Sequence, residues 1–518
     1  MQKTKVFAAI DIGSYELAMK IFELSGTKGV RELDHVVHRL DLGTETYATG
    51  KISAHHVREI VEILKEYQDI MRGYEVKNYR AVATSAFRET KDKEIVMNLL
   101  EQQTGVAVQV LSNSEQRFIN YKAIALRGER FHSFIEKPTA ILDLGGGSIQ
   151  LSIFDKDKLV ATQNMRLGIL RMQHLLQLLD APPEQYRPLV AELAEAQVEA
   201  FCKMYLRDRR MRNLIVVDDY IAPYLQTHRM GSNGDGFAEI TELKRMLAAS
   251  EKMSRAELAR RTDMPIERIP LMRISALLID YIASALGAEM LWAPGATLCD
   301  GIAYDYAEEK KYIASSHDFD RDILASAASM AKRYMCGKKK AEALQATALK
   351  LFDLLKKEHG LSGREKLLLQ ICTLLHECGR FISMLNTAES AYHIIMSTEM
   401  IGLSHREREI VAQTVRLSQL HRDELLAHSA RFVSDKSEDT LLVAKLSAIL
   451  QLAGGLTRTQ EQKVGNIKLK RKERELVISV SEQVSTVVER GFLKDSAALF
   501  TEVYGIEPFI RRKGTDGN

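Results

Sequence analysis

The amino-acid sequence predicts a duplicated α/β domain, followed by a helical domain and a small α/β domain. The segments Ala8–Tyr15 (AAIDIGSY) and Ile141–Gln150 (ILDLGGGSIQ) share one order, in which an apolar strand ends in an acid and a glycine-containing turn leads into a second strand. Each segment begins a succession of three strands, a helix, a strand and a helix, and such repetition indicates a duplicated unit. Beyond about residue 315, strand-like alternation gives way to the 3.6-residue period of amphipathic helices.

The first copy is expected to begin with a strand at Val6–Ile10. Ser53 can cap a helix that ends at Gly73, and the polar segment LGTETYATGKIS before it is expected to be a loop. The apolar face of that helix is formed by Val57, Ile60, Val61, Leu64 and Tyr67. The other expected elements are strands at Leu17–Leu24, Gly29–Leu40, Tyr79–Ala83 and Val106–Leu111, and helices near Asp92–Gln103 and from Ser112 onward.

Apolar periodicity also predicts the elements of the second copy and of the helical part. We expect strands at 140–143, 150–154, 159–166 and 214–217, helices up to about residue 310, and a flexible loop at Met230–Phe237. Helical periodicity then covers Phe319–Cys336, Lys340–His359, Glu365–Phe381, His405–Leu417 and Leu441–Ala453. The last part predicts strands within Lys468–Val480 and a helix over Ser485–Tyr504, with Gly491 as a candidate break. The expected domains are residues 1–130, 131–312, 316–458 and 459–518.

The amino-acid composition indicates which kinds of partner and compartment to expect for the protein. The 518 residues are 46% hydrophobic and 27% charged with a net charge of +3, which gives no overall argument for nucleic acid or membrane. The five cysteines form no CxxC pair, which favours reduced thiols in a cytoplasmic protein. The first residues show no signal-peptide pattern, and acids interrupt the apolar stretch Ala276–Ala303, so we expect no membrane span.

The two glycine-containing turns are the candidate binding elements. Glycine lets backbone amides approach a ligand closely, and a nest of amides suits phosphate oxygens. Asp11 and Asp143 each end the strand before a turn and are placed to hold a cation or a water beside that phosphate. The alternative is a tight hairpin that needs only positive φ angles. The second copy of the pattern favours phosphate binding.

Between the two turns lie AVATSAFRE (Ala81–Glu89) and VQVLSNSEQR (Val108–Arg117). Later segments are LLHECGR (Leu374–Arg380), SAYHII (Ser390–Ile395) and LFTEVYG (Leu499–Gly505). With the turns, these motifs resemble the exopolyphosphatase/guanosine pentaphosphatase (Ppx/GppA) family of the actin–hexokinase–chaperone ATPase superfamily, over nearly the whole chain. The resemblance implies two RNase H-like (actin-like) subdomains, an all-α HD-like domain and a small α/β tail.

The resemblance also implies Mg²⁺-dependent attack of water on a terminal phosphoanhydride of inorganic polyphosphate or a guanosine polyphosphate. Asp11 and Asp143 would hold the metal, and Glu115 would be the general base. The implied phosphate ligands are Gly13, Ser14, Arg88, Gly145, Gly146, Gly147, Ser148 and Gln150. As alternatives, Glu115 could be an acid in the first turn of a helix, and Arg88 could form a surface ion pair.

Several positions depart from the family's pattern. Gln150 replaces a glutamate, and glutamine can neither act as a base nor hold a cation by charge. Asp218–Ala222 (DDYIA) replaces a third glycine turn, and its two acids would oppose a polyanion unless they bind a cation. Leu298–Gly301 (LCDG) lacks an arginine.

The helical domain lacks most of the metal ligands that its resemblance would imply. His376-Glu377 stands at the HD position, while Lys340 and Ser418 stand where histidines would complete a metal site. We therefore expect a structural domain that forms a channel wall or the surface of a homodimer.

The leading hypothesis is an exopolyphosphatase-like hydrolase, with guanosine pentaphosphate as the close alternative substrate. The long C-terminal region favours a polymer. Gln150 and the altered third loop motivate a rival, a homologue that binds polyphosphate or guanosine polyphosphates but turns them over poorly. A sugar kinase is disfavoured because the adenosine-side glycine loop is missing.

Overall fold

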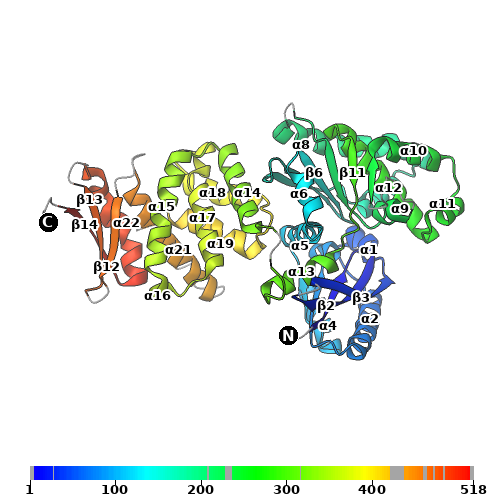
Figure 1. The fold of residues 1–518 in the computed structure, drawn as a ribbon, viewed down its shortest axis with the longest axis horizontal. Coiled ribbons are helices and arrows are strands. Elements are labelled where there is room, and N and C mark those ends of the chain that lie inside the picture. The colour runs from blue at the N-terminus through cyan, green and yellow to red at the C-terminus, as the bar shows by residue number, and fades with distance from the viewer. Residues whose placement is uncertain are drawn as a thin grey trace. The chain divides into compact units, whose positions relative to one another are not determined.

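The protein divides into two compact units, one up to Phe319 and one from Asp320 onward (Figure 1). The computed structural model describes residues 5–26, 29–206, 209–227, 236–314, 317–420, 437–458, 464–470, 473–481 and 485–513. Most of the predicted loop at Met230–Phe237 lies outside these ranges.

The first unit contains two sheets with a repeated strand order. The first sheet is ordered β3-β2-β1-β4-β5, and the second contains β8-β7-β6-β9-β11 with β10 added at its edge. In each sheet the first three strands pair antiparallel and the next two run parallel to the first. The predicted duplication is therefore present. The strands are β1 Lys5–Ile12, β2 Glu16–Ser25, β3 Gly29–Arg39, β4 Asn78–Ala83, β5 Val108–Val110, β6 Thr139–Leu144, β7 Ile149–Phe154, β8 Leu159–Met165, β9 Asn213–Val217, β10 Phe237–Glu239 and β11 Met290–Trp292.

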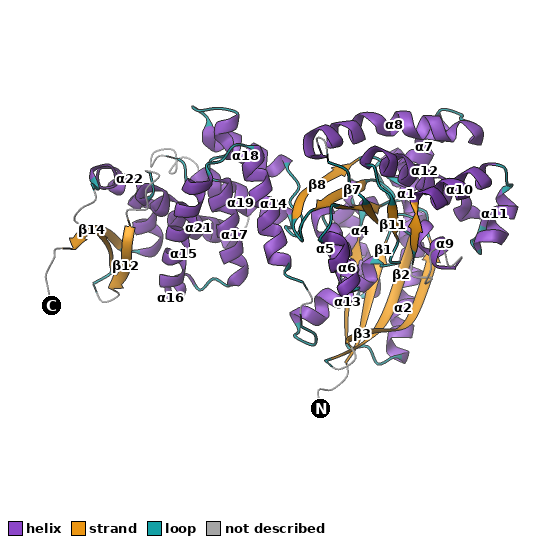
Figure 2. Ribbon diagram, turned by 45° about the horizontal axis from the view of Figure 1, so that its top comes forward, coloured by secondary structure: helices purple, strands orange, loops and turns teal. Residues whose placement is uncertain are grey.

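Helices flank both sheets (Figure 2). The first sheet packs against α2 and α4 on one face and α13 on the other, while α7, α8 and α12 pack in the core of the second. The helices of the first unit are α1 Leu42–Thr49, α2 Ala54–Gly73, α3 Ser85–Glu89, α4 Lys93–Thr104, α5 Asn113–Ala125, α6 Glu129–Ile135, α7 Ile169–Leu178, α8 Tyr186–Phe201, α9 Ile221–Thr227, α10 Ile240–Glu251, α11 Arg255–Thr262, α12 Ile269–Leu286 and α13 Leu298–Glu309.

Helix α13 follows the second sheet in the chain but packs on the first. Its Ile302 and Tyr306 share a buried cluster with Phe7 and Phe22 of the first sheet, and the Phe7 and Tyr306 rings stack at 4.1 Å. The predicted range 131–312 therefore includes a helix that covers the first sheet.

In the first copy the predicted helix cap at Ser53 is present, but the predicted loop before it is not. Ser53 caps α2 as predicted, because its side chain accepts a hydrogen bond from the His56 amide. The expected polar loop is wrong, since Leu42–Thr49 forms helix α1, capped by Asp41. This short helix buries few apolar side chains, so apolar periodicity does not reveal it.

The second unit is mostly helical and ends in a three-stranded sheet, β12-β13-β14. The predicted helix Glu365–Phe381 is wrong at its end, because α17 stops at Leu375 and a 3₁₀ turn covers Cys378–Phe381. Helix α22 continues through Gly491, and the sequence reading missed β14. The elements are α14 Phe319–Arg333, α15 Lys338–Leu354, α16 Lys356–His359, α17 Gly363–Leu375, α18 Thr387–Ser397, α19 His405–Leu417, α21 Ser437–Leu456, β12 Val464–Lys470, β13 Glu475–Ser481, α22 Val487–Tyr504 and β14 Glu507–Lys513.

Two helices are long and apolar enough to cross a membrane by length and composition alone. They are Ile266–Leu286 and Glu438–Leu456, and 72% and 56% of their most apolar windows are buried inside the protein. Buried core helices of globular proteins have the same properties.

Candidate active site

A cleft of about 140 Å³ opens in the first unit where the two glycine-containing turns meet. A Cβ atom placed on Gly146 would lie 3.3 Å from the Cβ atom of Ser14, so the turns are in contact. The residues that line the cleft include Asp11, Gly13, Ser14, Arg88, Gln116, Arg117, Asn120, Asp143, Gly145, Gly146, Ser148 and Asp219. The structure therefore brings together most of the predicted phosphate ligands and both predicted metal ligands.

Both turns are hairpins, yet the hairpin alternative does not explain their glycines. The Gly13 amide donates to the Glu16 carbonyl at 2.9 Å, and the Gly145 amide donates to the Ser148 carbonyl at 3.0 Å. None of Gly13, Gly145, Gly146 and Gly147 adopts a left-handed φ. Glycine is needed here for close packing.

The second turn is enclosed by neighbouring atoms. A Cβ atom on Gly147 would lie 2.8 Å from the Tyr47 hydroxyl, and one on Gly168 would lie 2.2 Å from the Gly146 carbonyl oxygen. The amides of Gly146, Gly147 and Ser148 meet no acceptor among the described residues. Three amides held in this way can donate to phosphate oxygens.

The Ser14 hydroxyl joins the first turn to its surroundings. It lies 2.6 Å from the Ser85 hydroxyl and 2.9 Å from the Tyr47 hydroxyl, and it accepts a hydrogen bond from the Ala86 amide. Its side chain is buried. This hydroxyl therefore positions the turn, and sequence reasoning missed Tyr47 because it lies in the unpredicted helix α1.

Asp11 contributes a buried carboxylate oxygen to the cleft. Its Oδ1 atom is buried and has no hydrogen-bond partner in the part of the chain that the structure describes. Burial, and then the nearby carboxylates Asp219 and Glu16, raise its pKa to about 8. An acid in this position is either protonated or charge-paired with a cation.

The loop Asp218–Ala222, which replaces the family's third glycine turn, brings further carboxylates close to Asp11. The Asp218 carboxylate accepts hydrogen bonds from the amides of Ile221 and Ala222 and from Ser275, so it is committed to the start of α9. Asp219 also lines the cleft, where desolvation, followed by the carboxylates of Glu16 and Asp218, raises its pKa to about 7.

Asp143 has protein partners at both oxygens. It forms an ion pair with Arg117 and accepts a hydrogen bond from Asn120 Nδ2 at 2.7 Å. Burial raises its pKa, while Arg117 and Asn120 act in the opposite direction. Arg117 also donates to the Ser148 carbonyl at 3.0 Å and so braces the second turn. A cation at Asp143 would have to compete with this guanidinium.

Helix α5 presents Gln116 to the cleft, whereas Glu115 caps the helix. The Glu115 carboxylate accepts a hydrogen bond from the Ser112 amide at 2.9 Å, in a capping box with Ser112. Gln116 Oε1 accepts from Arg88 Nη1 at 3.0 Å, and both residues line the cleft. The S-x-x-E pattern at Ser112–Glu115 is the sequence signal that could have indicated this arrangement.

Gln150 is not among the residues that line the cleft. Its buried amide Nε2 donates to Thr162 Oγ1 at 2.6 Å, and Ser152 completes a small polar group between β7 and β8. Gln150 is the cross-strand partner of Asp143 in the pairing of β6 with β7, and its Oε1 atom is buried without a hydrogen-bond partner among the described residues.

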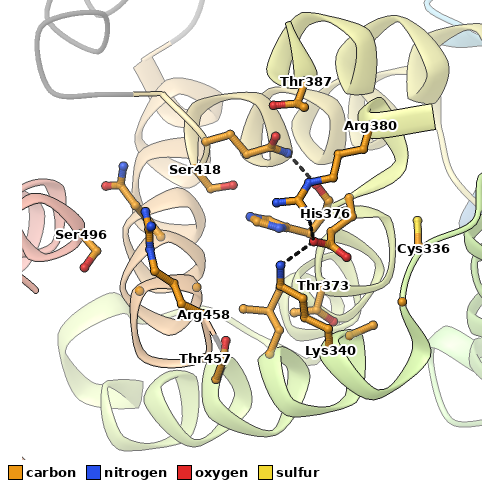
Figure 3. Close-up of a pocket in the computed structure, with 18 of the residues that line it drawn as sticks. Cys336, Lys340, Thr373, His376, Arg380, Thr387, Ser418, Thr457, Arg458 and Ser496 are labelled. Atoms are coloured by element: carbon orange, nitrogen blue, oxygen red, sulfur yellow. Dashed lines mark hydrogen bonds and ion pairs between the residues drawn. The ribbon is translucent and has the colours of Figure 1, made fainter. Parts of the chain in front are cut away.

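The second unit contains a larger cavity of about 480 Å³ (Figure 3). Glu377 Oε1 lies 2.6 Å from Lys340 Nζ and 2.6 Å from Arg380 Nη1, so two cations from the protein neutralise it. Burial lowers the pKa of His376 to about 4, which keeps that imidazole neutral. The Lys340 ammonium thus forms an ion pair with Glu377, the acid at the HD position of the sequence.

The first unit thus consists of two lobes of repeated topology, with a cleft that is lined by both glycine-containing turns and by Asp11 and Asp143. Backbone amides and carboxylates in such a cleft are suited to binding phosphate together with a cation. Comparison with known proteins gives the family. A model of the Ppx/GppA phosphatase family matches residues 28–309, and a model of Ppx/GppA phosphatase, domain III, matches residues 324–499. The chain belongs to the Ppx/GppA phosphatase family, which consists of phosphoanhydride hydrolases.

Individual relatives are distant. A guanosine-5'-triphosphate,3'-diphosphate pyrophosphatase of Aeromonas hydrophila is 20% identical over 416 residues, covering 80% of each chain. Exopolyphosphatase 2 of Mycobacterium tuberculosis is 24% identical over 209 residues, which are 38% of this chain and 63% of that protein. The crystal structure of an exopolyphosphatase from Cytophaga hutchinsonii has a TM-score of 0.51 at 17% identity, covering 61% of this chain and all of that one. This likeness supports the actin-like fold.

Proposed function

We propose that the protein hydrolyses the terminal phosphoanhydride of inorganic polyphosphate with the aid of Mg²⁺. The observation that supports this is that Gly146 and Ser148 of the second turn line the same cleft as Asp11, whose Oδ1 atom has no partner among the described residues. Phosphoryl transfer mainly requires positioning and charge neutralisation, and this arrangement can supply both. A cytoplasmic location and a homodimer, as expected from the sequence, are part of the same proposal.

The cleft residues fit a magnesium ion. Mg²⁺ usually takes one or two carboxylates together with waters and substrate oxygens. Asp11 has a buried oxygen without a partner, and Asp219 and Glu16 place further negative charge nearby. When bound, Mg²⁺ would neutralise charge on the phosphate oxygens. Among the two predicted ligands, Asp11 fits this role better than Asp143, because Arg117 and Asn120 occupy the latter.

The other contacts of the substrate come from the turns and from Arg88. The three amides of the second turn would receive the terminal phosphate, and Arg88 lines the same cleft within reach of a phosphate oxygen. A guanidinium is suited to this contact because it offers several donors in one plane.

Two adjacent residues are candidates for positioning the attacking water. The family resemblance implies Glu115, which would have to leave its capping box, whereas Gln116 already lines the cleft. An amide oxygen can accept a hydrogen bond from water but cannot remove its proton at neutral pH. A protein that relies on Gln116 would therefore hydrolyse its substrate slowly, as the rival hypothesis of a weakly active binding protein requires.

A guanosine polyphosphate is the second candidate substrate. It is favoured by the Aeromonas hydrophila relative, which matches over 80% of both chains and is named for such a substrate. Phosphate release from long-chain polyphosphate and from guanosine pentaphosphate, measured with and without Mg²⁺, tests both. Release from polyphosphate at the higher kcat/KM supports the proposal; release from the nucleotide alone supports the second candidate. Binding without release by the wild-type protein would overturn both.

Substitutions on α5 separate the two candidates for water positioning. If Gln116 positions the water, Gln116→Glu should raise kcat by about tenfold or more, because it places a base at the cleft. Glu115→Gln should then cost only about 1 kcal/mol of stability through the capping box. Phosphate release and chemical denaturation of both variants measure these effects. A hundredfold loss of kcat in Glu115→Gln would instead assign the base to Glu115.

A further inference from the structure

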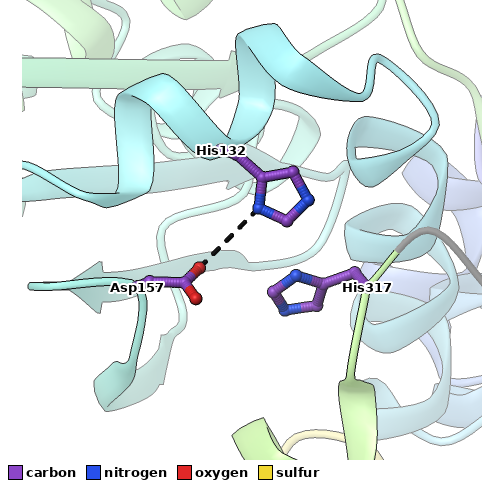
Figure 4. Close-up of side chains that lie close together, drawn as sticks. All are labelled: His132, Asp157 and His317. Atoms are coloured by element: carbon purple, nitrogen blue, oxygen red, sulfur yellow. Dashed lines mark ion pairs between the residues drawn. The ribbon is translucent and has the colours of Figure 1, made fainter.

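Three metal-ligand side chains from separate segments meet outside the cleft (Figure 4). His132 lies on α6, Asp157 lies in the turn between β7 and β8, and His317 lies just before α14. Their ligand atoms all lie within 4.8 Å of one another, and no other such group of three occurs among the residues that the structure describes. None of the three lines the glycine-turn cleft.

Neighbouring segments hold Asp157 and His317 in place. Asp157 has a left-handed φ of 57°, and its amide donates to the Ile135 carbonyl at 3.0 Å, which ties the β7–β8 turn to the end of α6. Nε2 of His317 lies 2.9 Å from the Tyr121 hydroxyl. Such a hydrogen bond fixes the ring orientation of a ligating histidine.

Aromatic rings shield the group on one side. The His317 ring packs at centroid distances of 5.7 Å from Phe131 and 5.1 Å from Phe319. All three ligand residues are half-buried, so a small ion can reach them from solvent while the apolar rings exclude water from part of the site.

An ion pair between His132 and Asp157 does not account for the His317 ring beside them. His132 Nδ1 lies 3.8 Å from Asp157 Oδ1, and the His132 and His317 rings lie 5.2 Å apart. If both imidazoles were protonated to pair with one carboxylate, they would repel each other. Two neutral imidazoles and a carboxylate form a donor set that Zn²⁺ prefers.

We propose that His132, Asp157 and His317 bind a divalent transition-metal ion, with Zn²⁺ preferred and water completing a tetrahedral site. Metal–ligand bonds of about 2.1 Å place ligand atoms about 3.4 Å apart, so small side-chain rotations from the observed positions complete the site. The bound ion joins α6, the β7–β8 turn and the segment with which the first unit ends. The site is independent of the proposed hydrolysis and serves to hold that segment in place.

Zinc competition with the full-length protein tests this proposal. The protein is stripped of metal, returned to excess Mg²⁺ to occupy carboxylate sites, and titrated with Zn²⁺ against a chromophoric chelator. Asp157→Asn is the main variant, because asparagine has nearly the same size and tolerates a left-handed φ. His317→Ala is the second variant, and His55→Ala, at an exposed position on α2, is the control.

The wild type and His55→Ala are expected to bind one Zn²⁺ tightly and to melt at a higher temperature when it is bound. Asp157→Asn and His317→Ala should each lose at least tenfold in affinity and most of the Zn²⁺-induced shift. Circular dichroism of the variants reports whether they are folded. Equal Zn²⁺ affinity in the wild type and folded Asp157→Asn, or no Zn²⁺ binding by the wild type, would overturn the proposal.

Discussion

Asp11→Asn is expected to lower Mg²⁺-dependent phosphate release by roughly 10²–10³-fold, because a magnesium ligand supplies several kcal/mol of charge stabilisation in phosphoryl transfer. The same change should remove most of the stabilisation that Mg²⁺ gives to the folded protein. Steady-state phosphate release and thermal melting with and without Mg²⁺ measure both effects. Asp69→Asn, at an exposed position on α2, is the matched control. Release within twofold of the wild type in Asp11→Asn would contradict the metal assignment.

The pH dependence of the metal-free protein gives an independent check on Asp11. Its pKa is about 8 in the folded protein and near 3.8 in the unfolded chain. Between these values the folded state binds the extra proton, so the free energy of unfolding should fall as pH rises from about 4 to about 8. The Asp219 carboxyl adds to this trend up to about pH 7. Chemical denaturation in a chelator should show a lower free energy of unfolding at pH 8 than at pH 5. Asp11→Asn should reduce this difference by on the order of 2 kcal/mol, a value below the full linkage because water reaches the cleft.

Gly168→Ala is expected to destabilise the protein by about 3 kcal/mol or more and to abolish most phosphate release. The added Cβ atom would meet the Gly146 carbonyl oxygen and the Gly147 carbonyl carbon, both at 2.2 Å. These are backbone atoms of the second turn, so relief of the clash must displace the amides proposed to bind phosphate. Gly73→Ala is the matched control, because a Cβ atom at this last residue of α2 meets nothing within 4 Å. That change should be neutral or stabilising by up to about 1 kcal/mol.

Denaturant unfolding of Gly168→Ala and Gly73→Ala, followed by phosphate release at a temperature where both are folded, measures these effects. A folded Gly168→Ala protein with wild-type release would show that the geometry of the second turn does not limit the reaction.

The sequence predicts the duplicated architecture well, because local patterns determine it. The repeated strand–acid–glycine order marks both sheets, and the apolar spacing from Val57 to Tyr67 indicates α2 directly. The packing of α13 on the first sheet could not be predicted, since it depends on contacts between residues almost 300 positions apart, such as Phe7 and Tyr306.

The candidate site was harder to predict in detail, because adjacent residues of a helix point in different directions. Glu115 and Gln116 differ by one position on α5, and only the start of the helix at Ser112 determines which of them faces the cleft. The pairing of Asp143 with Arg117 likewise requires the position of α5 against β6.

The place of α13 has a consequence for the order in which the chain can fold. The lobe that begins at the N-terminus is closed by residues 298–309, which a ribosome adds only after the whole second sheet. Until then Phe7 and Phe22 lack the helix that covers them, and exposed apolar surface of this kind promotes aggregation. A fragment that ends near residue 130 should therefore be insoluble, whereas the two lobes should mature together as one cooperative unit during synthesis.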